Sequence, residues 1–117
     1  MRDFFRSHIA VVAVIFLAAM FVGTSFAQSK CEYTYDNFGK DFLSKYCTSC
    51  HSEKVTGVKR MGAPSDFNFD SPDKIKPHTK DMVEQVVTNK SMPPTLNRPS
   101  DADRTKFGKW LECEYKK

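Results

Sequence analysis

The chain has 117 residues, of which 40% are hydrophobic and 27% are charged, and its formal net charge is +4. This length and composition indicate one small globular domain and exclude a disordered, collagen-like or repeat protein. The basic residues form no dense run, so nucleic-acid binding is not expected, and four cysteines are many for so short a chain.

Residues 1–27 have the three parts of a secretory signal peptide. Arg2 and Arg6 give the positive start, Ile9–Val22 is an unbroken apolar run, and small residues lead to Ala27. Cleavage after Ala27 would leave residues 28–117 as an exported, periplasmic domain, in a compartment where cysteines are readily oxidised. The apolar run is shorter than the roughly 20 residues of a membrane-spanning helix. Only an uncleaved signal segment would anchor the protein to a membrane.

The segment that follows the signal predicts a helix. Large apolar side chains recur there at helical spacing: Tyr35, Phe38, Phe42, Leu43 and Tyr46. We therefore expect a first helix from about Asp36 into residues 47–51.

Cys47, Cys50 and His51 form the sequence C-x-x-C-H, which is the attachment motif of c-type haem. Two thiols three positions apart can each form a thioether with one vinyl group of the same haem, and the adjacent imidazole can then bind the iron. The motif therefore predicts one covalent haem c, bound by these three residues, with His51 as an iron ligand.

Three other interpretations of the motif compete with haem attachment. The two cysteines could form a disulfide. They could also act as a redox C-x-x-C pair, which needs a βαβ context that the sequence does not indicate. A zinc site using all four cysteines is the third interpretation, but it lacks a second close pair of Cys or His ligands.

Further helices are predicted beyond a loop that spans residues 51–70. Ser71 followed by Pro72 indicates the start of a short helix, and Thr79 is expected to cap the next one, which would run to about Thr88. Ser100 is expected to cap a last helix. The inward face of that helix would carry Phe107, Trp110 and Leu111. No strand pattern is evident, so the expected fold class is all-α.

The second axial ligand separates an electron carrier from a haem catalyst with an open site. Four side chains could supply it: Met61, His78, Met82 and Met92. Met92 precedes two prolines, which favour a stiff loop able to hold a thioether sulfur over the iron. Met61 is only ten residues from His51, and Met82 lies in the apolar stripe of a helix. We therefore assign the second metal ligand to Met92 and keep His78 as the alternative.

Four short segments of the sequence match a known pattern: Cys47–His51, Arg60–Pro64, Met92–Pro94 and Lys109–Leu111. With them the chain resembles the small class I, mono-haem c-type cytochromes of bacteria over essentially all of residues 28–117. The resemblance implies about four helices wrapped around one haem, His/Met ligation, and electron transfer without substrate chemistry. Members of that family often carry a glycine just before the axial-methionine loop, where this chain has Lys90 and Ser91.

The resemblance also implies roles for residues outside the motif. Pro64 would offer its carbonyl to the second ring nitrogen of His51, although an ordinary turn proline is the alternative. Gly39 would mark a close crossing of the first and last helices. Because that crossing would bring the chain ends together, Cys31 and Cys113 are expected to form a disulfide, with two free thiols as the alternative.

Two pairs of side chains in the predicted loop have expected positions near the haem. Phe67 and Phe69 are expected to pack against it. Arg60 and Asn68 could each pair with a haem propionate, although ordinary solvation at the surface is an equal alternative.

These expectations together predict an electron carrier and not an enzyme. With His51 and Met92 both on the iron, no small-molecule substrate would bind it, and one electron would be exchanged with donor and acceptor redox proteins. Scattered lysines would steer acidic docking surfaces of such partners towards the haem edge. Two alternatives are kept: a haem subunit of a larger oxidoreductase complex, and an open-site haem catalyst or ligand sensor.

Overall fold

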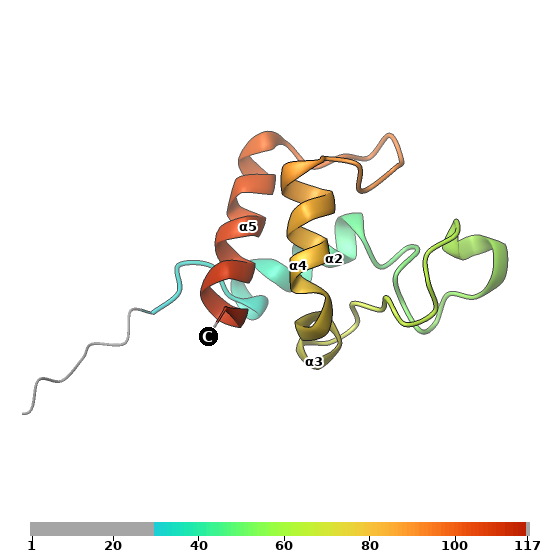
Figure 1. Cartoon of the computed structure of the whole chain (residues 1–117), viewed down its shortest axis with the longest axis horizontal. Helices are drawn as coiled ribbons and strands as arrows, with labels where there is room; N and C mark the ends of the chain where they lie inside the picture. Colours follow the sequence, from blue (N-terminus) through green and yellow to red (C-terminus); the bar gives the residue numbers. More distant parts are fainter. Residues whose placement is uncertain (1–29, 117) are drawn as a thin grey trace, which may run out of the picture.

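A computed structural model of the chain describes residues 30–116, and the predicted signal peptide lies outside these residues. Every regular element between residues 30 and 116 is helical, so the expected all-α class is confirmed. Figure 1 shows α4 (Thr79–Val83) and α5 (Asp101–Tyr115) side by side, with a loop-rich region beyond them. No helix in the described part of the chain is long and apolar enough to cross a membrane.

Residues 30–116 contain three main helical segments, joined by loops. The first consists of a π-helical turn, η1 (Tyr35–Gly39), continued by α2 (Lys40–Tyr46). The last is α5. A short 3-10 turn, η2 (Gly57–Arg60), lies in the long loop after the first segment. The helix expected from about residue 36 therefore forms.

The middle helical segment corrects the expected count of about four helices. It runs from residue 72 to residue 88 through four short elements: α3 (Pro72–Ile75), η3 (Lys76–His78), α4 (Thr79–Val83) and η4 (Glu84–Thr88). Thr79 does not cap a separate helix, because its backbone is helical and its hydroxyl donates to the Lys76 carbonyl, 3.3 Å away. Pro77 lacks an N–H, and the 3-10 turn η3 accommodates it, so the chain stays helical there.

The N-terminal caps predicted from the sequence are confirmed in part. Ser100 caps α5 as expected, since its hydroxyl accepts a hydrogen bond from the backbone N–H of Asp103, 3.1 Å away. Ser71 takes the N-cap position of α3 without a side-chain bond. Thr34 and Asn37 form a reciprocal capping box on η1, which the sequence analysis missed.

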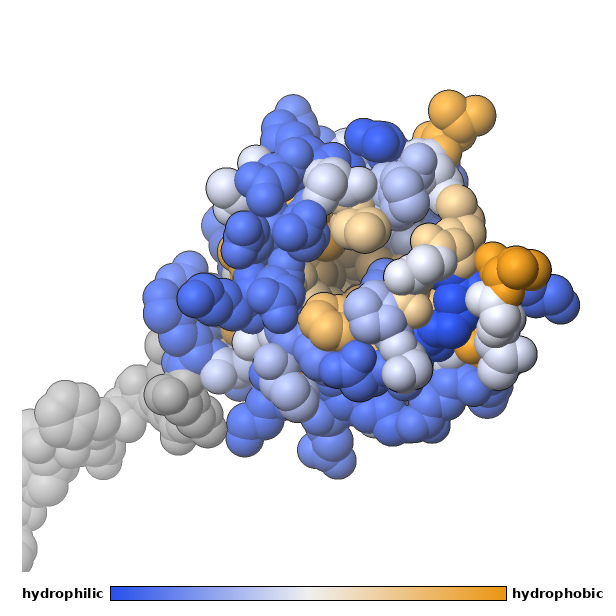
Figure 2. Space-filling model, turned by 45° about the vertical axis from the view of Figure 1, so that its right-hand side comes forward, coloured by the Kyte–Doolittle hydropathy of each residue, from blue (hydrophilic) through white to orange (hydrophobic). Residues whose placement is uncertain are grey.

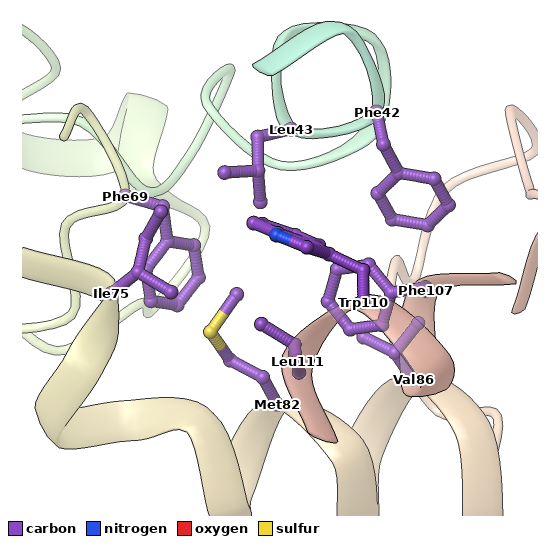
Figure 3. Close-up of a cluster of buried hydrophobic side chains, with 9 residues drawn as sticks. All are labelled: Phe42, Leu43, Phe69, Ile75, Met82, Val86, Phe107, Trp110 and Leu111. Carbon is purple, nitrogen blue, oxygen red and sulfur yellow. The ribbon is translucent and has the colours of Figure 1, made fainter. Parts of the chain in front are cut away.

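The core is one cluster of nine buried side chains: Phe42, Leu43, Phe69, Ile75, Met82, Val86, Phe107, Trp110 and Leu111. Figure 3 shows Trp110 in the middle of this cluster. The three side chains predicted to face inward from the last helix are all buried, and Phe107 packs on Phe42 with ring centroids 4.5 Å apart. The first and last helical segments therefore share one core.

Gly39 lies directly against Trp110, where the first helical segment meets α5. A Cβ atom on Gly39 would lie only 2.3 Å from the indole ring, so glycine is required for this close approach. Next to it, the Glu114 carboxylate accepts hydrogen bonds from the Tyr35 backbone N–H, 2.8 Å away, and from the Trp110 indole N–H. One side chain of α5 thus satisfies both a helix N-terminus and a buried indole.

Cys31 and Cys113 lie at disulfide-bonding distance, with Cα atoms 5.8 Å apart and 82 positions apart in the sequence. This is the pairing expected from the sequence. The bond links the segment before η1 to the last turn of α5, next to the Glu114 contact. The two ends of the described domain are therefore held together covalently.

We predict that Gly39→Ala lowers the free energy of unfolding by about 2 kcal/mol or more, because the added methyl group must displace a rigid, buried indole. Urea unfolding measures this change. Gly108→Ala is the matched control, since a Cβ there would lie 3.5 Å from Val87, which is ordinary contact. That variant should keep or slightly raise the stability, because alanine favours helix more than glycine. Equal stability of the two variants would contradict the close crossing.

Candidate functional site

A cavity of about 220 Å³ opens between the end of the first helical segment, the long loop, the middle segment and residues 92–95. Figure 2 shows a hollow with apolar residues inside it and mostly hydrophilic residues around it. All five residues that the sequence assigned to cofactor binding line the cavity: Cys47, Cys50, His51, Pro64 and Met92. The structure therefore brings together side chains from distant parts of the sequence.

The motif continues directly from α2. The Cys47 backbone N–H donates to the Leu43 carbonyl, 2.8 Å away, and the Cys47 carbonyl accepts from the N–H groups of Cys50 and His51, at 3.1 and 2.9 Å. These bonds keep residues 47–51 in about one helical turn. Because residues three positions apart lie on the same side of such a turn, both thiols contribute to the same cavity wall.

The cysteine pairing bears on the competing interpretations of the motif. Cys47 and Cys50 are free thiols, whereas Cys31 and Cys113 are paired elsewhere, which argues against a four-cysteine zinc site and a disulfide within the motif. A redox C-x-x-C pair would need strands, and residues 30–116 contain none. Burial raises the pKa of Cys47 to about 12, so this thiol is neutral at physiological pH.

The His51 imidazole is held on two sides. Its Nδ1–H donates to the Phe67 carbonyl, 2.9 Å away, and its ring stacks on Phe69 with centroids 4.8 Å apart. Nε2 has no hydrogen-bond partner among the described residues. Burial lowers the pKa of His51, against the opposing effect of the Phe67 hydrogen bond. A neutral, oriented imidazole with Nε2 available is the form that binds a metal.

The carbonyl that holds His51 comes from Phe67, which corrects the role expected of Pro64. Pro64 lines the cavity, but its own carbonyl accepts a hydrogen bond from the Arg60 guanidinium. The reason is a turn in which the Phe67 N–H donates to the Pro64 carbonyl at 3.1 Å. This turn carries the chain three residues further before a carbonyl reaches the imidazole. The structure therefore agrees with the alternative kept for Pro64, an ordinary turn proline.

Arg60 organises the loop that carries this carbonyl. Its side chain donates to the side-chain oxygen of Asn68, 3.0 Å away, and to five backbone carbonyls: those of Ser52, Val55, Ala63, Pro64 and Phe67. Asn68 is itself buried and donates to the Ser65 carbonyl at 2.8 Å. Both side chains thus hold the loop, which leaves them little capacity for the propionate contacts considered from the sequence.

Met92 reaches the cavity from the loop between η4 and α5, and about a third of its surface is exposed. Its backbone N–H donates to the Gln85 carbonyl at 3.1 Å, and its own carbonyl accepts from the Arg104 guanidinium at 2.8 Å. The backbone of Met92 is therefore fixed on both sides. The buried Arg104 is a residue that the sequence analysis missed, because no local pattern marks it.

The turn before Met92 contains a residue in the left-handed conformation. Lys90 has a φ of +53°, which is the left-handed conformation that glycine adopts most easily. Its ammonium group pairs with the Asp101 carboxylate at 2.7 Å, at the start of α5. This left-handed turn is therefore made by a lysine whose side chain is also paired with the last helix.

The other candidates for the second ligand differ in their positions. His78 does not line the cavity: its Nε2 is 3.1 Å from the Asp66 carbonyl, and its ring packs on Phe67. Met61 and Met82 do line the cavity. Met82 is almost fully buried in the core, whereas Met61 is 61% exposed. The geometry therefore favours a thioether over a second imidazole.

The comparisons with known proteins give no relatives for this chain. It matches no protein-family model, no curated protein and no solved structure. The functional argument therefore rests on the site itself.

We predict that Arg60→Lys lowers the free energy of unfolding by about 2 kcal/mol or more, because one ammonium group cannot reach the six oxygen acceptors that surround the planar guanidinium. Urea unfolding measures the loss, and Lys59→Gln is the control, since Lys59 is exposed next to Arg60 on the same turn. A loss in Arg60→Lys no larger than that in Lys59→Gln would show that Arg60 does not hold the loop.

Proposed function

We propose that this chain is an electron carrier that transfers one electron at a time through a single, covalently attached c-type haem. The observation that carries the proposal is the cavity, where Cys47, Cys50 and His51 meet Met92 from a distant loop. In this proposal, residues 28–117 form a small class I cytochrome c fold. The signal predicted over residues 1–27 would export the domain to the periplasm.

The residues around the cavity fit this group in their chemistry. Two free thiols from one turn can add to two vinyl groups, and a neutral imidazole with a thioether is a common ligand pair for haem iron. The rest of the lining is largely apolar and includes Tyr46, Phe67 and Phe69. Such a lining suits a flat macrocycle that is polar only at its propionates.

The protein's own residues would orient the ligands. The Phe67 carbonyl accepts a hydrogen bond from the Nδ1–H of His51, which leaves Nε2 free to bind a metal and would make it a stronger electron donor. The neutral, soft sulfur of Met92 would favour reduced iron and raise the potential above that of a bis-histidine site. When bound, a haem would supply the one-electron chemistry by which the protein exchanges an electron with donor and acceptor proteins.

The partners in this proposal are redox proteins that present acidic docking surfaces, with no nucleic acid and no small-molecule substrate. The surface carries apolar and basic side chains close together: Val58 and Leu96 are almost fully exposed, and Lys59 and Arg98 follow them closely in the sequence and are exposed too. Mixed basic and apolar surfaces suit brief encounters, in which charge speeds association and small contacts allow release.

The first test of the proposal removes the attachment thiols. We expect Cys47→Ala combined with Cys50→Ala to abolish covalent haem, because no sulfur would remain to bond the vinyl groups. Haem-stained denaturing gels of the exported protein measure this, and Cys31→Ser combined with Cys113→Ser is the control, since that pair lies outside the cavity. Equal staining of both double variants, or none in the unchanged protein, would refute haem attachment at the motif.

The second test concerns the sixth ligand. We expect Met92→Ala to make the reduced protein bind carbon monoxide readily and to lower the reduction potential, because the site loses its thioether. Absorbance spectra and redox titration measure both effects. Met61→Ala and Met82→Leu are the controls, as they alter the other two thioethers at the cavity. Carbon monoxide binding by the unchanged protein would instead support the open-site alternative.

A further inference from the structure

Arg104 is the one charged side chain that is buried among residues 30–116, with an exposed fraction of 4%. It forms no ion pair within the described chain. It also lies in the first turns of α5, near the positive end of the helix dipole, where a cation is unfavourable. Burying a cation in this way costs free energy unless hydrogen bonds compensate it. The identity of its partners therefore decides what it does.

Both hydrogen-bond partners of Arg104 are backbone carbonyls beside the cavity. Nη1 donates to the Val86 carbonyl in η4 and to the Met92 carbonyl, the latter at 2.8 Å. The guanidinium thus joins the middle helical segment, the Met92 loop and α5. The backbone N–H of Met92 donates to the Gln85 carbonyl, so the backbone of Met92 is held by two helical segments.

We propose that Arg104 is a positioning residue for the sixth ligand, which sets how often the Met92 thioether leaves the metal. This inference rests on the proposed function, because it needs a ligated haem. Without the guanidinium, the Met92 carbonyl would lose the one side-chain donor that it has among residues 30–116, and the loop would be held on that side by its neighbours alone. Both bonds come from one nitrogen, Nη1, so the ammonium group of a lysine would keep the charge and part of this donor capacity, without the reach of the guanidinium.

Ligand exchange at the oxidised iron measures the proposed role. Cyanide can bind only when Met92 has left, so its association rate reports how often the loop opens. We expect Arg104→Met to raise the cyanide association rate of the holoprotein about tenfold or more, as expected for the loss of a charged hydrogen bond. Arg104→Lys should give a smaller increase. Hydrogen exchange at the Met92 amide, which donates to Gln85, should speed up in the same order.

Two controls separate positioning from general stability and charge. Ile75→Val removes a methylene from the core away from the cavity lining, so it lowers stability without touching the Met92 loop. Lys106→Gln removes a partly exposed positive charge from the same helix. Both should keep the cyanide rate of the unchanged protein.

Three outcomes would overturn the proposal. One is an unchanged cyanide rate and amide exchange in both Arg104 variants, of which Arg104→Lys keeps the charge and is the safer for folding. Another is an equal acceleration in Ile75→Val, which would assign the effect to stability. If Met92→Ala itself binds cyanide no faster than the unchanged protein, Met92 is not the ligand, and the ligand assignment in the proposed function fails together with this inference.

Discussion

The packing of the Trp110 indole on the bare backbone of Gly39 is the contact on which the rest of the structure depends. It sets how closely α5 approaches the first helical segment, and the Glu114 carboxylate and the Cys31–Cys113 bond hold the same region together. The far ends of these two segments carry the site. The end of α2 leads into Cys47–His51, and the start of α5 carries Arg104 beside the Met92 loop.

Part of the cavity wall in this small domain is formed by loops. Two arginines donate hydrogen bonds to backbone carbonyls that these loops do not pair in regular secondary structure. Arg60 donates to the carbonyls of the loop that holds His51, and Arg104 donates to the carbonyls beside Met92. In both cases a guanidinium satisfies several carbonyls that a loop leaves unpaired. The two predicted axial ligands are thus each positioned by backbone, and each backbone segment is positioned by an arginine.

Local features of the fold could be predicted from the sequence because they depend on neighbouring residues. The spacing of apolar side chains gave the helices, and Ser100 was recognised as a cap. The candidate site was predicted from the C-x-x-C-H motif, because the spacing of its two cysteines and its histidine is that of a haem attachment sequence. The resemblance to a cytochrome family supplied the Gly39 crossing and the Cys31–Cys113 pairing, which depend on two distant segments.

The features that sequence reasoning missed depend on contacts between segments whose relative positions no local pattern encodes. A buried arginine such as Arg104 has the same sequence signal as an exposed one. The carbonyl that holds His51 could come from any residue of the loop, and a single turn moved it from Pro64 to Phe67. The helix predicted to begin at Thr79 does not begin there. The Thr79 hydroxyl donates to the Lys76 carbonyl in the preceding turn instead of capping a helix N-terminus.

The central claim is that residues 47–51 carry one covalent haem in an exported protein. The mass of the intact exported chain, with the mass of its peptide containing Cys47 and Cys50, tests that claim most directly. The account predicts a chain that begins at Gln28 and is heavier by one haem, with the added mass confined to that peptide. An unmodified peptide, or one whose two cysteines are joined to each other, would contradict the account.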